Sequence, residues 1–105
     1  MSEAVAAILQ RSEAKPRLIV LFGSEARGDA TPESDIDILV VLESDDPPVV
    51  AALRDAVYDV MWQHDFSRLI SIVTFSRERF EEQKRKGFSF VKNLEREGII
   101  LWPAA

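Results

Sequence analysis

Two short motifs in this sequence hold residues that could do chemistry. Gly23-Ser24 directly follows one apolar run, and Asp35 and Asp37 stand at the head of the next. A glycine backbone can approach a ligand closely, and the free N–H groups of a helix start favour an anion such as phosphate. Two carboxylates two residues apart on a strand share one face, about 6–7 Å apart, and suit Mg²⁺. Together these motifs indicate metal-assisted phosphoryl or nucleotidyl transfer.

Other uses of the same residues fit less well. Residues 23–28 have the glycine spacing of a P-loop, but Asp29-Ala30 stands where Lys-Ser/Thr is needed. Asp35 and Asp37 could begin an EF-hand loop, but Leu39-Val40 occupies the positions of an oxygen ligand and a glycine. The remaining alternative is that the two acids only solubilise a strand end. The Gly-Ser pair upstream favours a ligand site over that alternative.

Length and composition bound the class of protein. We expect 105 residues to form one domain, 1–105. Hydrophobic residues make up 47% and charged residues 30%, as in an ordinary soluble protein. No apolar run reaches the roughly 18–20 residues of a membrane span, and no signal peptide is recognisable. A cytoplasmic location is therefore expected.

Residue types missing from the chain exclude several kinds of site. There is no cysteine, and His64 is the single histidine, which excludes disulfides, cysteine nucleophiles and a multi-histidine zinc site. The 18 acidic residues outnumber the 13 basic ones, for a net charge of −5. Direct nucleic-acid binding is not expected, because phosphate contacts require a basic surface. Seven of the acids lie between residues 27 and 46.

Alternating helical and strand patterns must position the two motifs. Asp35–Leu42 is apolar on both faces after Asp37, which is typical of a central strand. Ser2, Ser24 and Ser76 are predicted N-caps, and Gly98 the residue after a helix end. We predict an α/β (α+β) fold, a small mixed sheet of about four strands flanked by helices. The predicted helices are 2–14, a single turn from 24, 47–63, 77–85 and 89–97, and the predicted strands are 17–22, 35–42, 69–75 and 99–102.

Residues 21–28 followed by 34–40 resemble the signature of the minimal nucleotidyltransferases, small members of the DNA polymerase beta-type superfamily. The shared pattern is Gly-Ser, about ten residues, then Asp-x-Asp, and residues 88–102 also resemble the ending of such chains. The resemblance implies a polymerase beta palm-like nucleotidyltransferase fold. It also implies that Gly23 and Ser24 hold the phosphates of ATP or another NTP. Asp35 and Asp37 would be catalytic and bind Mg²⁺ or Mn²⁺, and Arg27 would steady the acidic loop or the phosphates.

One departure from the family pattern concerns the next strand. Active members carry a third carboxylate there, which helps to hold the catalytic metal and in many members is the general base. Here Ser71 stands in that place, within Ile70-Ser71-Ile72-Val73. A serine performs neither task well near neutral pH, and Asp65, six residues earlier, is a weak substitute. We expect Ser71 to lie on the same side of the sheet as Asp35 and Asp37.

The resemblance implies two functions of different classes. In the first, the chain transfers a nucleotidyl group to a partner, typically a HEPN-domain protein in a toxin–antitoxin pair, and is the antitoxin. In the second, it is a catalytically silent module that neutralises such a partner by binding alone. A structural domain without a ligand is a weaker third alternative. The sequence does not decide whether the chain forms a homo-oligomer. Trp62 and Trp102 are expected in the core or at an interface.

Overall fold

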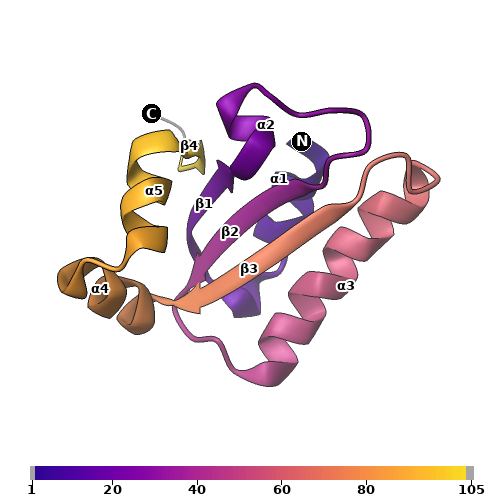
Figure 1. Cartoon of the computed structure of the whole chain (residues 1–105). Coiled ribbons are helices and arrows are strands. Elements are labelled where there is room, and N and C mark those ends of the chain that lie inside the picture. Colours follow the sequence, from indigo (N-terminus) through magenta and orange to yellow (C-terminus); the bar gives the residue numbers. More distant parts are fainter. Residues whose placement is uncertain (1, 104–105) are drawn as a thin grey trace.

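The computed structural model describes residues 2–103, apart from the side chains of Ser2 and Ser12, so the predicted N-cap role of Ser2 lies outside the described part. The helices and strands follow the predicted order (Figure 1). Their bounds are α1 Ser2–Leu9, a 3₁₀ turn Ser12–Ala14, β1 Pro16–Phe22, α2 Gly23–Arg27, β2 Ile36–Leu42, α3 Pro47–Gln63, β3 Ile70–Ser76, α4 Arg77–Lys86, α5 Ser89–Glu97 and β4 Ile99–Trp102.

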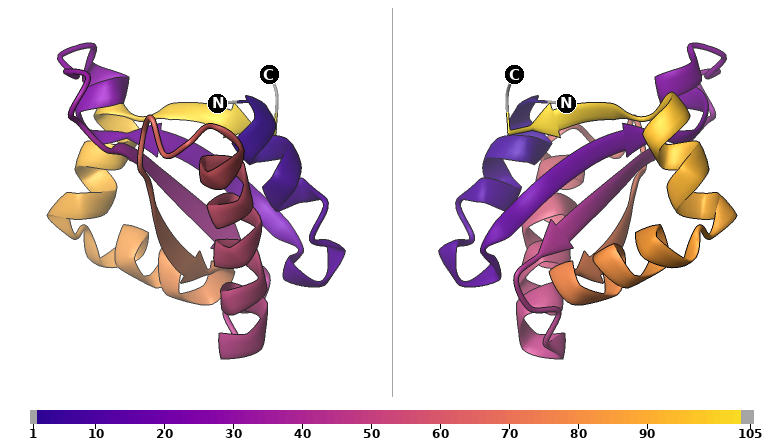
Figure 2. Two further views of the ribbon diagram at one scale, coloured as in Figure 1. Left: turned by 90° about the vertical axis from the view of Figure 1, so that its right-hand side faces the viewer. Right: turned by 90° about the vertical axis from the view of Figure 1, so that its left-hand side faces the viewer.

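The four strands form one mixed sheet in the order β3-β2-β1-β4. Strand β2 pairs in parallel with β3 and antiparallel with β1, and β4 pairs antiparallel with β1. Helices α1 and α3 cover one face of the sheet, and α4 and α5 cover the other (Figure 2). This confirms the predicted mixed sheet flanked by helices.

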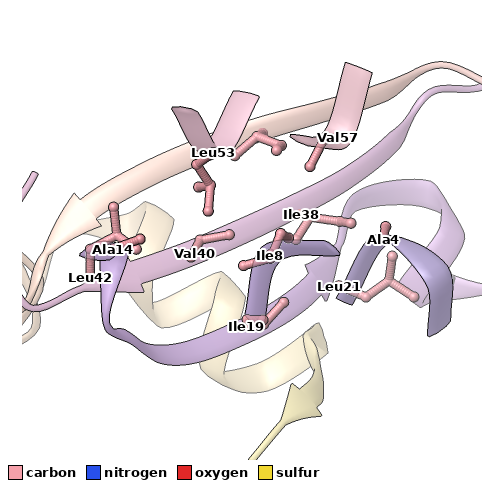
Figure 3. Close-up of a cluster of buried hydrophobic side chains, with 11 residues drawn as sticks. Ala4, Ile8, Ala14, Ile19, Leu21, Ile38, Val40, Leu42, Leu53 and Val57 are labelled. Atoms are coloured by element: carbon pink, nitrogen blue, oxygen red, sulfur yellow. The ribbon is translucent and has the colours of Figure 1, made fainter. Parts of the chain in front are cut away.

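Each face of the sheet has its own buried core, and β2 contributes to both. Ile38, Val40 and Leu42 face α1 and α3 (Figure 3), whereas Leu39 and Val41 face α4 and α5. All five side chains are buried. Alternation along the strand places Asp37 on the same face as Leu39, at the end where β2 begins. The strand is therefore central, as predicted, and its apolar part fixes the position of the acids at its head.

The helix predicted over residues 2–14 is shorter in the structure. Helix α1 ends at Leu9, and Ala14 N–H donates to Arg11 O at 3.0 Å in the tighter 3₁₀ turn that follows. This turn buries Ala14 against the core, and Lys15 then takes a left-handed conformation with φ 46°. A straight continuation of α1 could not bury Ala14 and also bring the chain back into β1.

Gly98 follows the end of α5, as predicted, and its φ is −71°. A Cβ on Gly98 would lie 2.5 Å from Leu94 O and 2.7 Å from Val20 Cγ1. Glycine is needed here because the chain passes close to β1, not because of its backbone angles. Between residues 2 and 103, no helix is long and apolar enough to cross a membrane.

Candidate functional site

The turn from β1 into α2 lies against the carboxylate of Asp37. Phe22, the last residue of β1, is in register with Asp37, and Gly23 follows with φ +74°. A Cβ on Gly23 would lie 2.5 Å from Asp37 Oδ2. Both the backbone angle and the lack of space therefore require glycine at this position. The structure thus brings together the Gly-Ser motif and the second acid of the Asp-x-Asp motif.

The two acids differ in their surroundings. Asp35 is exposed and precedes β2, which begins at Ile36 rather than at Asp35 as predicted. Asp37 is half-buried within the strand. Burial raises the pKa of Asp37 above its usual value, the negative charge of Asp35 raises it further, and the positive charge of Arg27 opposes both. Two mutually repelling carboxylates at one sheet edge form an environment that favours a cation.

Ser24 lies in the first turn of α2 and is not its N-cap as predicted. Phe22 occupies the cap position, because the chain turns sharply at Gly23 and enters the helix there. Ser24 O accepts the N–H groups of Gly28 and Asp29 at 3.0 and 3.1 Å, which closes the turn. Within residues 2–103, the Ser24 hydroxyl forms no hydrogen bond with another protein group. It can therefore bind a ligand without breaking an existing contact.

Arg27 is held among acidic side chains at the end of α2. Its Nε lies 3.3 Å from Asp29 Oδ2, and its Nη1 lies 3.9 Å from Glu97 Oε2 on α5. These contacts tie α2 to α5 and to the acidic loop, residues 28–35 between α2 and β2, which contains Asp29, Glu33 and Asp35. Both predicted roles of Arg27, toward the acidic loop and toward the phosphates, stay predictions.

Ser71 lies directly beside Asp37. The parallel strands β2 and β3 place Asp37 in register with Ser71, and Ile36 with Ile70. In-register neighbours on paired strands point to the same face of a sheet. This confirms that Ser71 lies on the Asp37 side, and the position predicted for a third carboxylate is occupied by an exposed hydroxyl group.

Arg68, which belongs to neither of the two sequence motifs, connects several parts of this site. Its Nη2 donates to Glu25 Oε2 on α2 at 3.1 Å and to Ser34 O at 2.9 Å, and its Nε also donates to Ser34 O. Ser34 directly precedes Asp35. The guanidinium group thus fixes the acidic loop relative to α2 and the start of β3. No sequence signal marks this role, because the partners lie 34 and 43 residues away.

The donor set at this site fits a hard divalent cation held in part by other ligands. Asp35 and Asp37 offer carboxylate oxygens at one sheet edge, and cation binding would reduce the repulsion that raises the Asp37 pKa. Among residues 2–103, no group of three or more His, Cys, Asp or Glu side chains forms a metal-binding cluster. Asp65, in the turn after α3, therefore does not replace the third acid. Water or phosphate oxygens would have to complete the coordination of Mg²⁺ or Mn²⁺.

Comparisons with known proteins agree with this geometry. The family model described as "Nucleotidyltransferase domain" matches residues 1–101. A protein of Methanocaldococcus jannaschii named "Putative protein adenylyltransferase MJ0604" is 34% identical over 102 residues, covering 97% of this chain and 94% of that protein. A solved structure described as "Crystal structure of the toxin-antitoxin with AMP-PNP" is similar at a TM-score of 0.61. It is 23% identical, and the match covers 96% of this chain and 72% of that one.

Proposed function

Because this chain belongs to the nucleotidyltransferase domain family, we propose that it binds ATP or another NTP with Mg²⁺ and transfers the nucleotidyl group to a hydroxyl group of a partner protein. The observation that supports this proposal is the contact of Gly23 with Asp37, which brings the turn proposed to bind phosphate against a carboxylate proposed to bind the metal. The name of the archaeal relative, a protein adenylyltransferase, supports a protein acceptor. The AMP-PNP of the similar toxin–antitoxin structure supports an adenine nucleotide.

In this proposal each residue of the site has a separate task. Ser24 and the N–H groups at the start of α2 bind the β- and γ-phosphates. Asp35 and Asp37 would hold Mg²⁺, which supplies charge neutralisation at the triphosphate. Arg27 and Arg68 hold the acidic loop and α2 in place. The acceptor oxygen forms a bond to the α-phosphorus, the bond from the α-phosphorus to the bridging oxygen breaks, and pyrophosphate leaves. The hydroxyl proton is released to solvent.

The catalytically silent module remains a second candidate, and Ser71 is the observation that favours it. The Ser71 hydroxyl stands in register with Asp37, where a carboxylate would accept the proton of the acceptor hydroxyl. A serine hydroxyl is not basic enough for this near neutral pH. In this second proposal the chain binds a HEPN-type toxin and neutralises it without modifying it. Both candidates describe an antitoxin, but only the first requires turnover.

One assay separates the two candidates. ATP labelled at its α-phosphate is incubated with the protein encoded by the adjacent gene and with native, Ser71→Asp or Asp35→Asn protein. We expect slow transfer by the native protein, and general-base assistance in Ser71→Asp to raise it by about 10²–10⁴-fold. Asp35→Asn serves as the blank. No labelling by either native or Ser71→Asp protein would favour the binding module. Fast, Asp35-dependent transfer by the native protein would exclude it.

A further inference from the structure

The side of α3 that faces away from the sheet carries a cluster of large exposed side chains. Tyr58 is 53% exposed and Trp62 67% exposed, although a core position was one expectation for Trp62. The ring of Phe66 packs edge-on against both, with centroids 5.3 Å from Tyr58 and 5.9 Å from Trp62. Leu69, 52% exposed, follows at the entry to β3. We call these four residues the α3 aromatic surface.

The backbone of the turn after α3 is set in an unfavourable conformation that presents Phe66. Asp65 and Phe66 have φ values of 53° and 54°, in the left-handed region. Such a conformation is uncommon for residues other than glycine, asparagine and aspartate, so it is unusual at Phe66. The turn closes α3 through a bond from Phe66 N–H to Met61 O at 2.9 Å, and glycine or asparagine is usual one residue earlier, where Asp65 stands. Phenylalanine here extends a contiguous aromatic surface, and such surfaces on soluble proteins mark interaction sites.

Acidic side chains border the aromatic rings. Asp55 and Asp59 lie one helical turn before Tyr58 and Trp62 respectively, and Asp65 adjoins Phe66. All three are exposed, and no ion pair between residues 2 and 103 includes any of them. An aromatic face beside an unpaired carboxylate suits arginine, which can stack on the ring and pair with the acid. Carboxylates at these positions would repel the phosphates of a nucleic acid.

The surface ends next to the candidate site. Leu69 O accepts the N–H of Ile36 at 2.8 Å, which places Leu69 beside Asp35. The turn between α3 and β3 lies at the same end of the sheet as the start of β2 (Figure 1). Because Asp37 lies on the face of the sheet opposite α3, a protein bound to the α3 aromatic surface would have to reach round this end of the sheet, past Leu69, to contact Asp35 and Asp37.

We propose that the α3 aromatic surface is the docking site for the acceptor protein, and that the docking face of this protein presents arginine or lysine among apolar residues. The inference rests on the proposed function only in identifying the docked protein as the acceptor. Apolar contact and charge complementarity both act at this surface, and each can be removed separately by substitution.

Binding is measured with two probes, the protein encoded by the adjacent gene and a short amphipathic helical peptide with leucine on one face and arginine at its borders. The chain has two tryptophans, Trp62 and Trp102. The background substitution Trp102→Phe leaves Trp62 as the only source of tryptophan fluorescence. We expect either probe to protect Trp62 from acrylamide quenching. Trp62→Ala and Asp59→Lys should each weaken binding by about tenfold or more, as loss of a central interface residue does.

The matched controls are Phe88→Ala, since Phe88 is also 52% exposed but lies next to α5, and Glu81→Lys on α4. Both should bind the probes like the native protein. The inference would be overturned if Trp62→Ala and Asp59→Lys bound the probes as tightly as the native protein does. It would also be overturned if the native protein bound neither probe, or if it bound single-stranded RNA in preference to them. A glutamate version of the peptide should not bind.

The docking inference and the proposed function can fail independently. Asp35→Asn should lose transfer of the label but retain binding to the adjacent-gene protein. Binding through Trp62 without transfer by any variant would remove the enzymatic function and leave the docking site. Conversely, normal transfer by Trp62→Ala at limiting partner concentration would remove the docking site and leave the function.

Discussion

Gly23 lies so close to Asp37 that a single additional carbon atom at Gly23 would stand 2.5 Å from the Asp37 carboxylate oxygen Oδ2. This relationship joins two motifs that are fourteen positions apart in the numbering, and it makes the turn into α2 and the head of β2 parts of one site. A change at either residue should therefore affect the other.

Gly23→Ala should destabilise the fold more than Gly28→Ala. Both glycines have positive φ, +74° and +82°, so either substitution should cost about 1–2 kcal/mol of backbone strain. At Gly28 no atom lies within 4 Å of the new Cβ, whereas at Gly23 the new Cβ collides with Asp37. Moving the Asp37 carboxylate out of its rotamer should add about 0.5–1.5 kcal/mol. Urea unfolding of the two variants measures the difference, and equal losses would contradict the contact.

Asp37→Asn should stabilise the metal-free protein above acidic pH. The pKa of Asp37 is raised above 3.8 in the folded state, chiefly by burial and then by Asp35. The folded state thus binds the proton more tightly, and ionisation of Asp37 lowers stability as pH rises from about 3.8 through the raised pKa. The stability advantage of the variant should appear across that window and stay constant above it. The free energies of unfolding of the native and Asp37→Asn proteins, measured from pH 3 to 7, test this prediction. A stability advantage of the variant that is present only at low pH would contradict a raised pKa of Asp37.

MgATP should raise the melting temperature of the native protein. A ligand that binds only the folded state stabilises it by about 1.4 kcal/mol at ten times its Kd. For a chain of this size that corresponds to a shift of several degrees. Ser24→Ala should reduce the shift, and Asp35→Asn should reduce it while leaving the unliganded fold as stable as before or more so. An unchanged melting curve at millimolar MgATP would remove the proposed phosphate site.

Arg68→Ala should weaken both the fold and the response to nucleotide. Loss of its half-buried bonds to Glu25 and to Ser34 O should cost about 1–3 kcal/mol and free the acidic loop from α2. Arg54→Ala is the matched control, because Arg54 also donates to a main-chain oxygen, that of Ile72, but at the edge of β3. If MgATP raises the melting temperature of Arg54→Ala as much as that of the native protein but raises that of Arg68→Ala less, Arg68 positions the nucleotide site. Equal shifts in both variants would show that Arg68 acts on stability alone.

Most of the fold could be predicted because its signals are local. Apolar runs bounded by proline, glycine or acids mark β1, β2 and β4, helical spacing of apolar residues marks α3 and α5, and the Ser76 cap marks the start of α4. The predicted bounds of β2 and β3 each differ by one residue from the structure. The predictions that were wrong concern places where packing overrides a local pattern. Burial of Ala14 shortens α1, and the sharp turn at Gly23 makes Phe22 rather than Ser24 the N-cap of α2.

The sequence by itself determined the two motifs and their places at the end of one strand and the head of the next, which follow from residue type and spacing within a few positions of the chain. That Ser71 stands where a third acid is expected came from the resemblance to the family. Only the tertiary structure decided that Asp37 and Ser71 are in register, that Arg68 joins Glu25 to the acidic loop, and that Trp62 faces solvent. Such contacts join residues more than thirty positions apart or depend on which side of a helix is covered. Periodicity shows which residues share a face, but the face that is buried depends on where the rest of the chain packs.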